Sequence, residues 1–111
     1  MELKFNYDNP VAIVTIEGNL NASCSEDLKE KFLKSINKTN NYIMDLSGMD
    51  FVDSTGLGAL VACLKYAVEK KGTIKIANLQ SKPKMLFEIT RVYRVFDIFD
   101  SVKAAIESFK N

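Results

Sequence analysis

The chain is most informative between residues 44 and 58, which read Met44-Asp45-Leu46-Ser47-Gly48-Met49-Asp50-Phe51-Val52-Asp53-Ser54-Thr55-Gly56-Leu57-Gly58. The run Tyr42–Leu46 is short, apolar and typical of a buried strand. From about Thr55 the apolar residues follow a helical period, because they recur at i, i+3, i+4, i+7 and i+11: Leu57, Leu60, Val61, Leu64 and Val68. A strand, a loop and a helix are therefore expected here. In α/β folds, partner and ligand sites lie beyond the carboxyl ends of parallel strands, which makes this loop the first candidate site.

Two strands are expected at the beginning of the chain. Leu3–Tyr7 alternates apolar and polar residues, which is typical of a strand with one buried face. Val11–Glu17 is apolar on both faces and therefore predicts a more central strand. The turn signal Asp8-Asn9-Pro10 lies between them and predicts an antiparallel hairpin.

A loop and a helix are expected next. Gly18-Asn19-Leu20-Asn21 has the composition of a loop. Ser23 and Glu26 then form a Ser-x-x-Glu pattern, which predicts a capping box at a helix start because each side chain can satisfy a free backbone amide. The helix carries an apolar stripe and ends in the polar run 37–41; the stripe is Leu28, Phe32, Leu33 and Ile36.

The second half of the chain continues the alternation of helices and strands. The helix that begins near Thr55 is expected to end at Lys70-Lys71-Gly72, with a glycine cap and cations at its negative end. Thr73–Ala77 predicts a strand. Ser81-Lys82-Pro83 predicts a helix start, because proline is tolerated in a first turn. This helix is expected to bury three residues: Met85, Leu86 and Ile89.

Arg94–Phe99 predicts a last strand or extended segment, and Asp100 is expected to cap a final helix whose apolar stripe is Val102, Ala105, Ile106 and Phe109. The predicted order is β-β-α-β-α-β-α-(β)-α. It indicates an α/β fold, with a mixed, mostly parallel sheet of four to five strands that starts with an antiparallel hairpin, and about four helices.

Composition limits the possible functions. The chain has 111 residues with 15 basic and 14 acidic side chains, so we expect one domain without the concentrated positive charge of nucleic-acid binding proteins. No apolar run approaches the roughly 20 residues of a membrane span. There is no histidine, which excludes most hydrolases that need an imidazole base. Cys24 and Cys63 are expected to be small apolar residues in a reducing compartment, and no leader is recognised, so a cytoplasmic location is expected.

Ser54 is the first candidate functional residue. It lies at or next to the N-cap of the predicted helix, where a hydroxyl often does no more than cap a backbone amide. The same place also tolerates a phosphoryl group, because the helix N-terminus presents free amides and a positive partial charge. Gly56 and Gly58 leave this end of the helix without side chains at two positions. Either something approaches the backbone there, or the helix packs tightly on the sheet.

Three enzyme-like patterns fit poorly. Gly56-x-Gly58 lacks the third glycine of a dinucleotide fingerprint. The run Asp53–Gly56 has one residue more than the aspartic protease motif. Asp45, Asp50 and Asp53 would need an acidic pair after the first parallel strand to form a receiver-like magnesium site, and the loop 18–21 offers none. A third hypothesis is a nucleotide-binding or nucleotide-hydrolysing domain, against which the absence of a Gly-Lys-Ser/Thr loop speaks.

The blocks Asp45-Leu46-Ser47 and Asp53-Ser54-Thr55-Gly56-Leu57-Gly58 closely resemble the signature of the STAS domain, in particular that of the bacterial anti-sigma factor antagonists. The resemblance extends over nearly all of residues 1–111, from the opening hairpin to the segment Val95–Phe99 before the last helix. It implies a single STAS domain with no active site and no cofactor or metal of its own.

The resemblance also implies partners. In the family, the unphosphorylated protein binds an anti-sigma factor that is also a serine kinase, and so frees the sigma factor. The kinase phosphorylates the serine after the motif aspartate, here Ser54, and a metal-dependent serine phosphatase reverses the reaction. The partner-binding residues that correspond here are Asp53, Ser54, Thr55, Gly56 and Leu57.

A loop of the family lies against the same site and ends in aspartate, where this chain has Asn21. The substitution removes one negative charge beside the phosphorylation site. The alternative to a phosphorylated antagonist is a STAS scaffold or subunit of a signalling or transport assembly that is not phosphorylated. The oligomeric state is left open.

Overall fold

A computed structural model describes residues 1–8, 10–36 and 39–110. Residue 9, in the middle of the predicted turn Asp8-Asn9-Pro10, and residues 37–38 of the polar run 37–41 therefore lie outside the described residues. The elements along the chain are β1 (Glu2–Asp8), β2 (Val11–Leu20), α1 (Ser25–Ser35), β3 (Asn41–Asp45), β4 (Met49–Val52), α2 (Ser54–Glu69), β5 (Thr73–Ala77), α3 (Ser81–Thr90), the 3-10 turn η1 (Val92–Arg94), β6 (Asp97–Phe99) and α4 (Val102–Ser108).

The sheet is mixed, as predicted. Its order is β1-β2-β3-β5-β6, and β4 pairs with β2 beside that path. β1 and β2 form the predicted antiparallel hairpin, with Leu3 opposite Ile16, and the other pairs are parallel. β2 is long enough to serve two neighbours in turn: residues 11–15 pair with β3 and residues 18–20 pair with β4.

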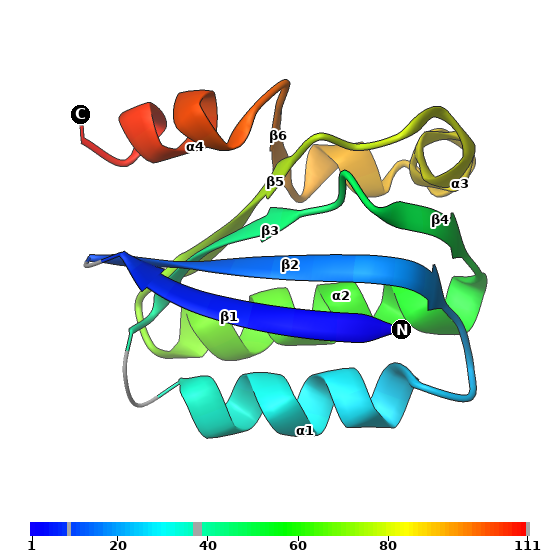
Figure 1. The fold of residues 1–111 in the computed structure, drawn as a ribbon, viewed down its shortest axis with the longest axis horizontal. Coiled ribbons are helices and arrows are strands. Elements are labelled where there is room, and N and C mark those ends of the chain that lie inside the picture. Colours follow the sequence, from blue (N-terminus) through cyan, green and yellow to red (C-terminus); the bar gives the residue numbers. More distant parts are fainter. Residues whose placement is uncertain (9, 37–38, 111) are drawn as a thin grey trace.

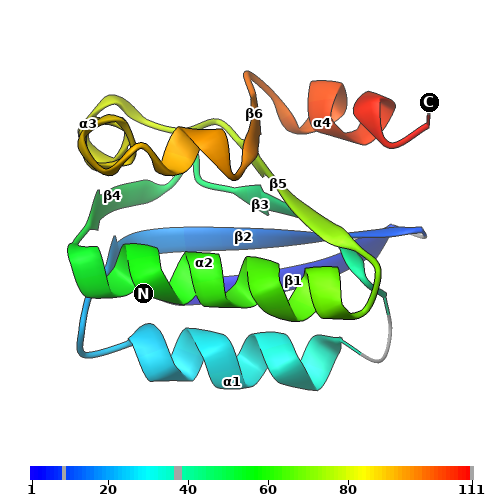
Figure 2. The ribbon, with the colours of Figure 1, turned by 180° about the vertical axis from the view of Figure 1, so that it is seen from behind.

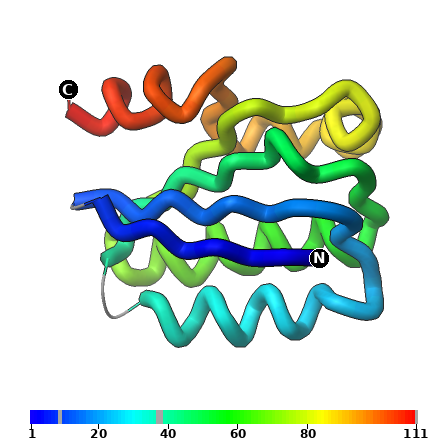
Figure 3. Tube along the Cα trace, viewed as in Figure 1, coloured from blue at the N-terminus to red at the C-terminus, as the bar shows by residue number. Residues whose placement is uncertain are grey.

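Helices cover both faces of the sheet (Figures 1 and 2). α1, α2 and α3 bury their apolar sides in one core, into which β2 and β3 point alternate residues such as Val14 and Met44. α4 covers the other face, where Ala105 packs with Ile43 and Ala77. In the Cα trace, the start of α2 and the whole of α3 lie at the same end of the sheet, and α4 runs toward the opposite end (Figure 3).

Strand β4 was not expected, and it raises the number of described strands to six. Its four residues do not alternate in the usual way, because Met49 and Val52 are buried while Asp50 and Phe51 between them are exposed. It forms because β2 continues to Leu20 instead of ending in a loop at Gly18. Gly18 has a φ of +88°, which a glycine adopts without strain, and the register shifts there.

Helix α1 begins differently from the prediction. The capping box does not form, because the Ser23 amide and hydroxyl both donate to Asn21 Oδ1, at 3.0 and 2.6 Å. The helix starts one residue later, with Cys24 at the N-cap and no side-chain cap. Because the Ser23 side chain is hydrogen-bonded to Asn21 in this tight turn, it does not cap the helix as the capping box requires.

Two further cap predictions, for the end of α2 and the start of α4, are each wrong by one residue. At the end of α2 the left-handed residue is Lys71, with a φ of 65°, rather than Gly72. Gly72 follows it and donates to the Ala67 carbonyl at 2.8 Å, and a side chain at Gly72 would overlap the backbone of Asn40. At α4 the cap is Ser101, whose side chain accepts from Ala104 N, rather than Asp100.

Helix α3 follows its predicted burial only in part: of Met85, Leu86 and Ile89, only Leu86 packs against the core. Pro83 and Phe87 are buried, whereas Met85 and Ile89 are 62% and 76% exposed. The reason is its position at the end of the sheet, where it contacts β4 and η1 rather than lying along the strands. Val68, at the end of the α2 stripe, is also exposed. The predicted strand 94–99 shortens to β6, because residues 92–94 form η1.

Candidate functional site

Asp53 organises the start of α2. It is the N-cap residue, and its Oδ1 accepts from the Gly56 amide at 2.7 Å. Its Oδ2 accepts from the Ala22 amide at 3.2 Å, in the segment that joins β2 to α1. One carboxylate therefore caps the helix and fastens a segment distant in the sequence to the helix end.

The backbones of β2 and α2 also meet here. The Asp53 amide donates to the Leu20 carbonyl at 3.2 Å. A Cβ on Gly56 would overlap that same carbonyl, so only glycine permits this approach. Of the two explanations for a bare helix end, tight packing on the sheet is correct for Gly56. Gly58 differs, because a Cβ there would have no atom within 4 Å.

Asn21 lies in the turn fastened by Asp53. Its side-chain oxygen is occupied by the Ser23 amide and hydroxyl, and its carbonyl accepts from the Ser25 amide at 3.0 Å and the Ser25 hydroxyl at 2.7 Å. The side chain is half-buried. The structure thus brings the Asn21 turn next to the start of α2, as the family resemblance implied, but gives Asn21 an intramolecular role in shaping the turn.

Ser54 is the first residue of α2, and its side chain is exposed. Asp53 supplies the cap, so the expectation that the Ser54 hydroxyl is a cap is wrong. Within the described part of the chain, neither the Ser54 nor the Thr55 hydroxyl has a hydrogen-bond partner. The Ser54 hydroxyl at the N-terminus of α2 therefore stabilises no part of the described structure and is accessible for chemical modification.

A groove of about 430 Å³ begins at Ser54 and follows the outer side of α2. Leu57, Gly58, Val61 and Ala62 form its floor, with Lys65 at the far end. Its second wall comes from Thr90 and Val92, at the end of α3 and in η1. Sequence reasoning did not find this wall, because only the tertiary packing of α3 brings these residues to α2.

The six predicted site residues thus have different positions. Asp53 and Asn21 are half-buried and hold the backbone, while Ser54 and Thr55 are exposed. Gly56 and Leu57 are buried, so they shape the surface from below. Gly56 and Gly58, the two glycines that resemble part of a dinucleotide fingerprint, both lie inside α2. Gly56 is needed there for the close packing against Leu20.

The described part of the chain holds no set of catalytic metal ligands at this site, and the buried thiol of Cys63 is not reactive. No group of three or more cysteine, aspartate or glutamate side chains that suits a metal occurs among residues 1–8, 10–36 and 39–110. Asp45 Oδ1 instead accepts from Ser47 N and Asn78 Nδ2, at 3.1 and 3.0 Å. Both cysteines are free thiols. Burial raises the pKa of the Cys63 thiol from 9.0 to about 12, which makes it a poor nucleophile at neutral pH.

Comparison with known proteins decides the family. The model of the STAS domain matches residues 2–105. This chain belongs to the STAS domain family. BtrV of Bordetella bronchiseptica, a candidate anti-sigma factor antagonist, is 23% identical to this STAS protein over 111 residues, covering 99% of this chain and 96% of BtrV. The anti-sigma-B factor antagonist of Bacillus subtilis is 29% identical over 85 residues, covering 77% and 78%.

Solved structures share the STAS fold. A candidate anti-sigma factor antagonist of Thermotoga maritima has a TM-score of 0.87 at 20% identity, covering 98% of this chain and 95% of that one. The antagonist SpoIIAA in its unphosphorylated form has a TM-score of 0.77 at 15% identity, covering 99% of both chains, and Bacillus SpoIIAA is also known in a phosphorylated form. The named relatives are regulators, which agrees with the prediction that this STAS protein is not an enzyme.

No helix among the described residues is long and apolar enough to cross a membrane.

Proposed function

We propose that this protein is an anti-sigma factor antagonist controlled by phosphorylation of Ser54. The unphosphorylated protein binds an anti-sigma factor that is a serine kinase and so releases the sigma factor. The kinase phosphorylates Ser54, and a metal-dependent serine phosphatase restores the free hydroxyl. The observation that carries the proposal is an exposed, unbonded Ser54 hydroxyl at the start of an apolar groove, beside an aspartate that has taken over the capping role.

The start of α2 suits a phosphoryl group. The positive end of the helix attracts an anion. Since the Ser54 side chain is exposed and makes no bond within the described structure, phosphorylation breaks no existing contact. It adds a charge of about −1.5 to −2 next to the Asp53 carboxylate. A large local change of charge therefore occurs without refolding, and a partner seated over Ser54 is repelled.

The groove supports a protein partner. It is lined mostly by apolar atoms of α2, and Gly58 leaves its floor open. A partner that fills it covers Ser54 at one end and meets the Lys65 ammonium at the other. If the kinase domain of an anti-sigma factor fills this groove, the Ser54 hydroxyl that it phosphorylates lies at the edge of the interface.

Asn21 is compatible with this function. Its side-chain oxygen accepts two hydrogen bonds from Ser23, and an aspartate oxygen accepts in the same way, so the turn keeps its shape with either residue. What Asn21 changes is charge, since one negative group fewer lies near Ser54. We take the protein to be a single cytoplasmic domain with no cofactor or direct contact to nucleic acid.

The proposal is tested with an anti-sigma factor kinase from the same organism, sought first among the neighbouring genes. Purified protein, kinase and ATP are incubated, and the modified residue is mapped by mass spectrometry. We expect one phosphoryl group on Ser54, none on Ser54→Ala, and full modification of Thr55→Ala as the matched control. Equal labelling of Ser54→Ala and wild type contradicts the assignment. Binding of a transporter or scaffold protein without any kinase effect supports the alternative, a STAS subunit that is not phosphorylated.

A further inference from the structure

β5 and β6 are parallel neighbours whose following segments leave toward opposite faces of the sheet. After β5 the chain enters α3, and Phe87 of α3 packs in the core shared with α1 and α2. After β6 it enters α4, and Ala105 of α4 packs on the other face. Diverging connections of this kind leave a crevice outside the carboxyl ends of the two strands, which is where open α/β sheets bind ligands.

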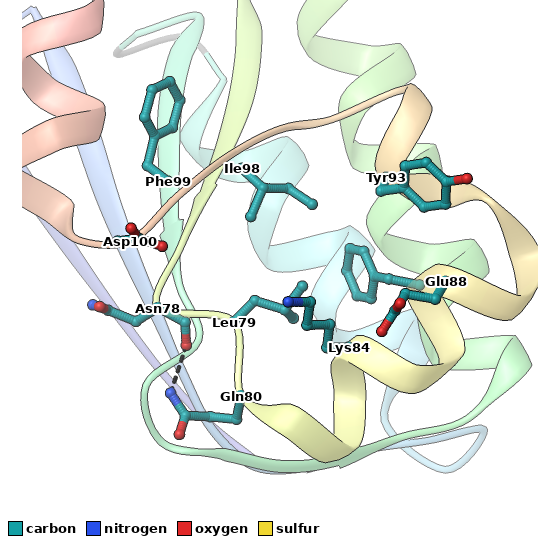
Figure 4. Close-up of a pocket in the computed structure, with 10 residues that line it drawn as sticks. Asn78, Leu79, Gln80, Lys84, Glu88, Tyr93, Ile98, Phe99 and Asp100 are labelled. Carbon is teal, nitrogen blue, oxygen red and sulfur yellow. Dashed lines mark hydrogen bonds between the residues drawn. The ribbon is translucent and has the colours of Figure 1, made fainter.

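A cleft of about 650 Å³ occupies this position (Figure 4). Leu79 and Ile98 provide apolar surface, the buried Phe87 lies beneath them, and polar side chains stand around them. Small-molecule sites in proteins have volumes of roughly 300–1,000 Å³ and the same combination of apolar walls with a few polar groups. The cleft is separate from the groove at Ser54, since the two share no lining residue.

The wall at the end of β5 is held in place before any ligand arrives. The Asn78 amide donates to the Phe99 carbonyl at 3.2 Å, and its side chain donates to Asp45 at 3.0 Å. Gln80 Nε2 donates to the Asn78 carbonyl at 2.7 Å, the contact drawn as a dashed line in Figure 4. A preformed wall lowers the entropy cost of binding.

The charged groups of the cleft are unpaired and of both signs. Lys84 and Glu88 lie one turn apart on α3, and Asp100 lies on the other side, after β6; in Figure 4, Leu79 and Ile98 appear between Lys84 and Asp100. In the described structure none of the three side chains takes part in an ion pair or hydrogen bond. One ammonium and two carboxylates are thus available to a ligand.

We propose that this cleft binds a small zwitterion with an apolar body, of the class of the free apolar α-amino acids. The ligand's carboxylate faces Lys84, its ammonium group faces Asp100 on the other side, and its side chain covers Leu79 and Ile98 between them. A polyphosphate is disfavoured because two carboxylates oppose one cation. A neutral apolar ligand is disfavoured because it would displace water from the three charged side chains without offering them hydrogen bonds or opposite charges in return.

The test uses the full chain, ¹⁵N-labelled and titrated with three probes in separate NMR experiments: L-phenylalanine, phenylacetate and 2-phenylethylamine. The last two each lack one of the two charges. We expect saturable shifts of the Asn78, Leu79 and Ile98 amides with L-phenylalanine, and affinities about tenfold lower for each analogue, equivalent to about 1.4 kcal/mol. Equal affinities for the three probes, or no saturable shift up to about 10 mM, overturn the proposal.

Substitutions of the exposed charged residues show which side chain contacts the carboxylate of the ligand and which contacts its ammonium group. Lys84→Gln is expected to weaken L-phenylalanine about tenfold and to leave 2-phenylethylamine unchanged. Asp100→Asn is expected to weaken both of these probes and to spare phenylacetate. Lys82→Gln is the matched control, because Lys82 lies on the same helix but outside the cleft. If Lys82→Gln has the same effect as Lys84→Gln, the binding is non-specific and the proposal fails. None of these outcomes depends on phosphorylation of Ser54.

Discussion

Asp53 Oδ2 lies 3.2 Å from the backbone nitrogen of Ala22, 31 residues away in the chain. The other oxygen of the same carboxylate caps α2 through the Gly56 amide. This single side chain therefore couples the turn after β2 to the helix end that presents Ser54. Truncation of Asp53 should lower the free energy of unfolding and loosen the proposed phosphorylation site at the same time.

Asp53→Ala is expected to lower the free energy of unfolding by about 1–2 kcal/mol, because a helix cap and a second backbone bond are both lost. Urea denaturation measures the change. Asp50→Ala is the control, since Asp50 is exposed on β4 and its side chain has no hydrogen bond or ion pair in the described structure, so a change within about 0.5 kcal/mol is expected. Equal effects of the two variants contradict the role given to Asp53.

The two glycines of α2 should respond in opposite ways to the same substitution. Gly56→Ala is expected to cost about 1–3 kcal/mol, because its Cβ meets the Leu20 backbone, which cannot move aside cheaply. Gly58→Ala is expected to gain about 0.5–1 kcal/mol, because alanine is the better helix former and the space is open. Thermal unfolding of both variants compares them directly. A destabilised Gly58→Ala would show that the groove floor is not open.

Ser54 and Ser101, at the starts of α2 and α4, provide another matched pair. Ser101 Oγ accepts from the Ala104 amide at 3.0 Å, so Ser101→Ala is expected to cost about 1 kcal/mol. Ser54 makes no such bond, and Ser54→Ala should change the free energy of unfolding by less than about 0.5 kcal/mol. Chemical denaturation checks both values. A large loss in Ser54→Ala would mean that the hydroxyl has a structural role.

Cys63 should make stability fall at alkaline pH. Burial raises the pKa of its thiol from 9.0 to about 12, so between these values the unfolded chain loses a proton that the folded chain keeps. Stability is thus complete below pH 9 and decreases above it, by up to about 1.4 kcal/mol per pH unit from this group. Urea denaturation at pH 8 and pH 10 measures the slope.

Cys63→Ala is the comparison for that slope. It should be less stable at pH 8, because the buried sulfur leaves a cavity, but its stability should fall less steeply toward pH 10. Identical slopes in wild type and variant would show that the thiol is not the group responsible. Cys24, half-buried at the start of α1, should remain the faster of the two thiols to react with an alkylating reagent at pH 8.

Several features follow from the sequence alone, because they depend on residues close together in the chain. The period-two pattern of β1, the apolar runs of β2 and β3 and the helical period from Leu57 each report which face of an element is buried. The motif around Asp53–Gly58 located the candidate site. Local patterning also explains why the antiparallel hairpin and the parallel remainder of the sheet were predicted correctly.

The tertiary structure decided the rest. Ser54 and Asp53 are both good caps by residue type, and the choice of Asp53 depends on Ala22 and Leu20 being brought to the helix end. Met85 and Ile89 have the spacing of buried residues, but α3 lies at the end of the sheet and leaves them exposed. The groove and the cleft need residues from segments far apart. Periodicity records which side of an element is apolar, whereas the partner that covers it depends on how the elements pack.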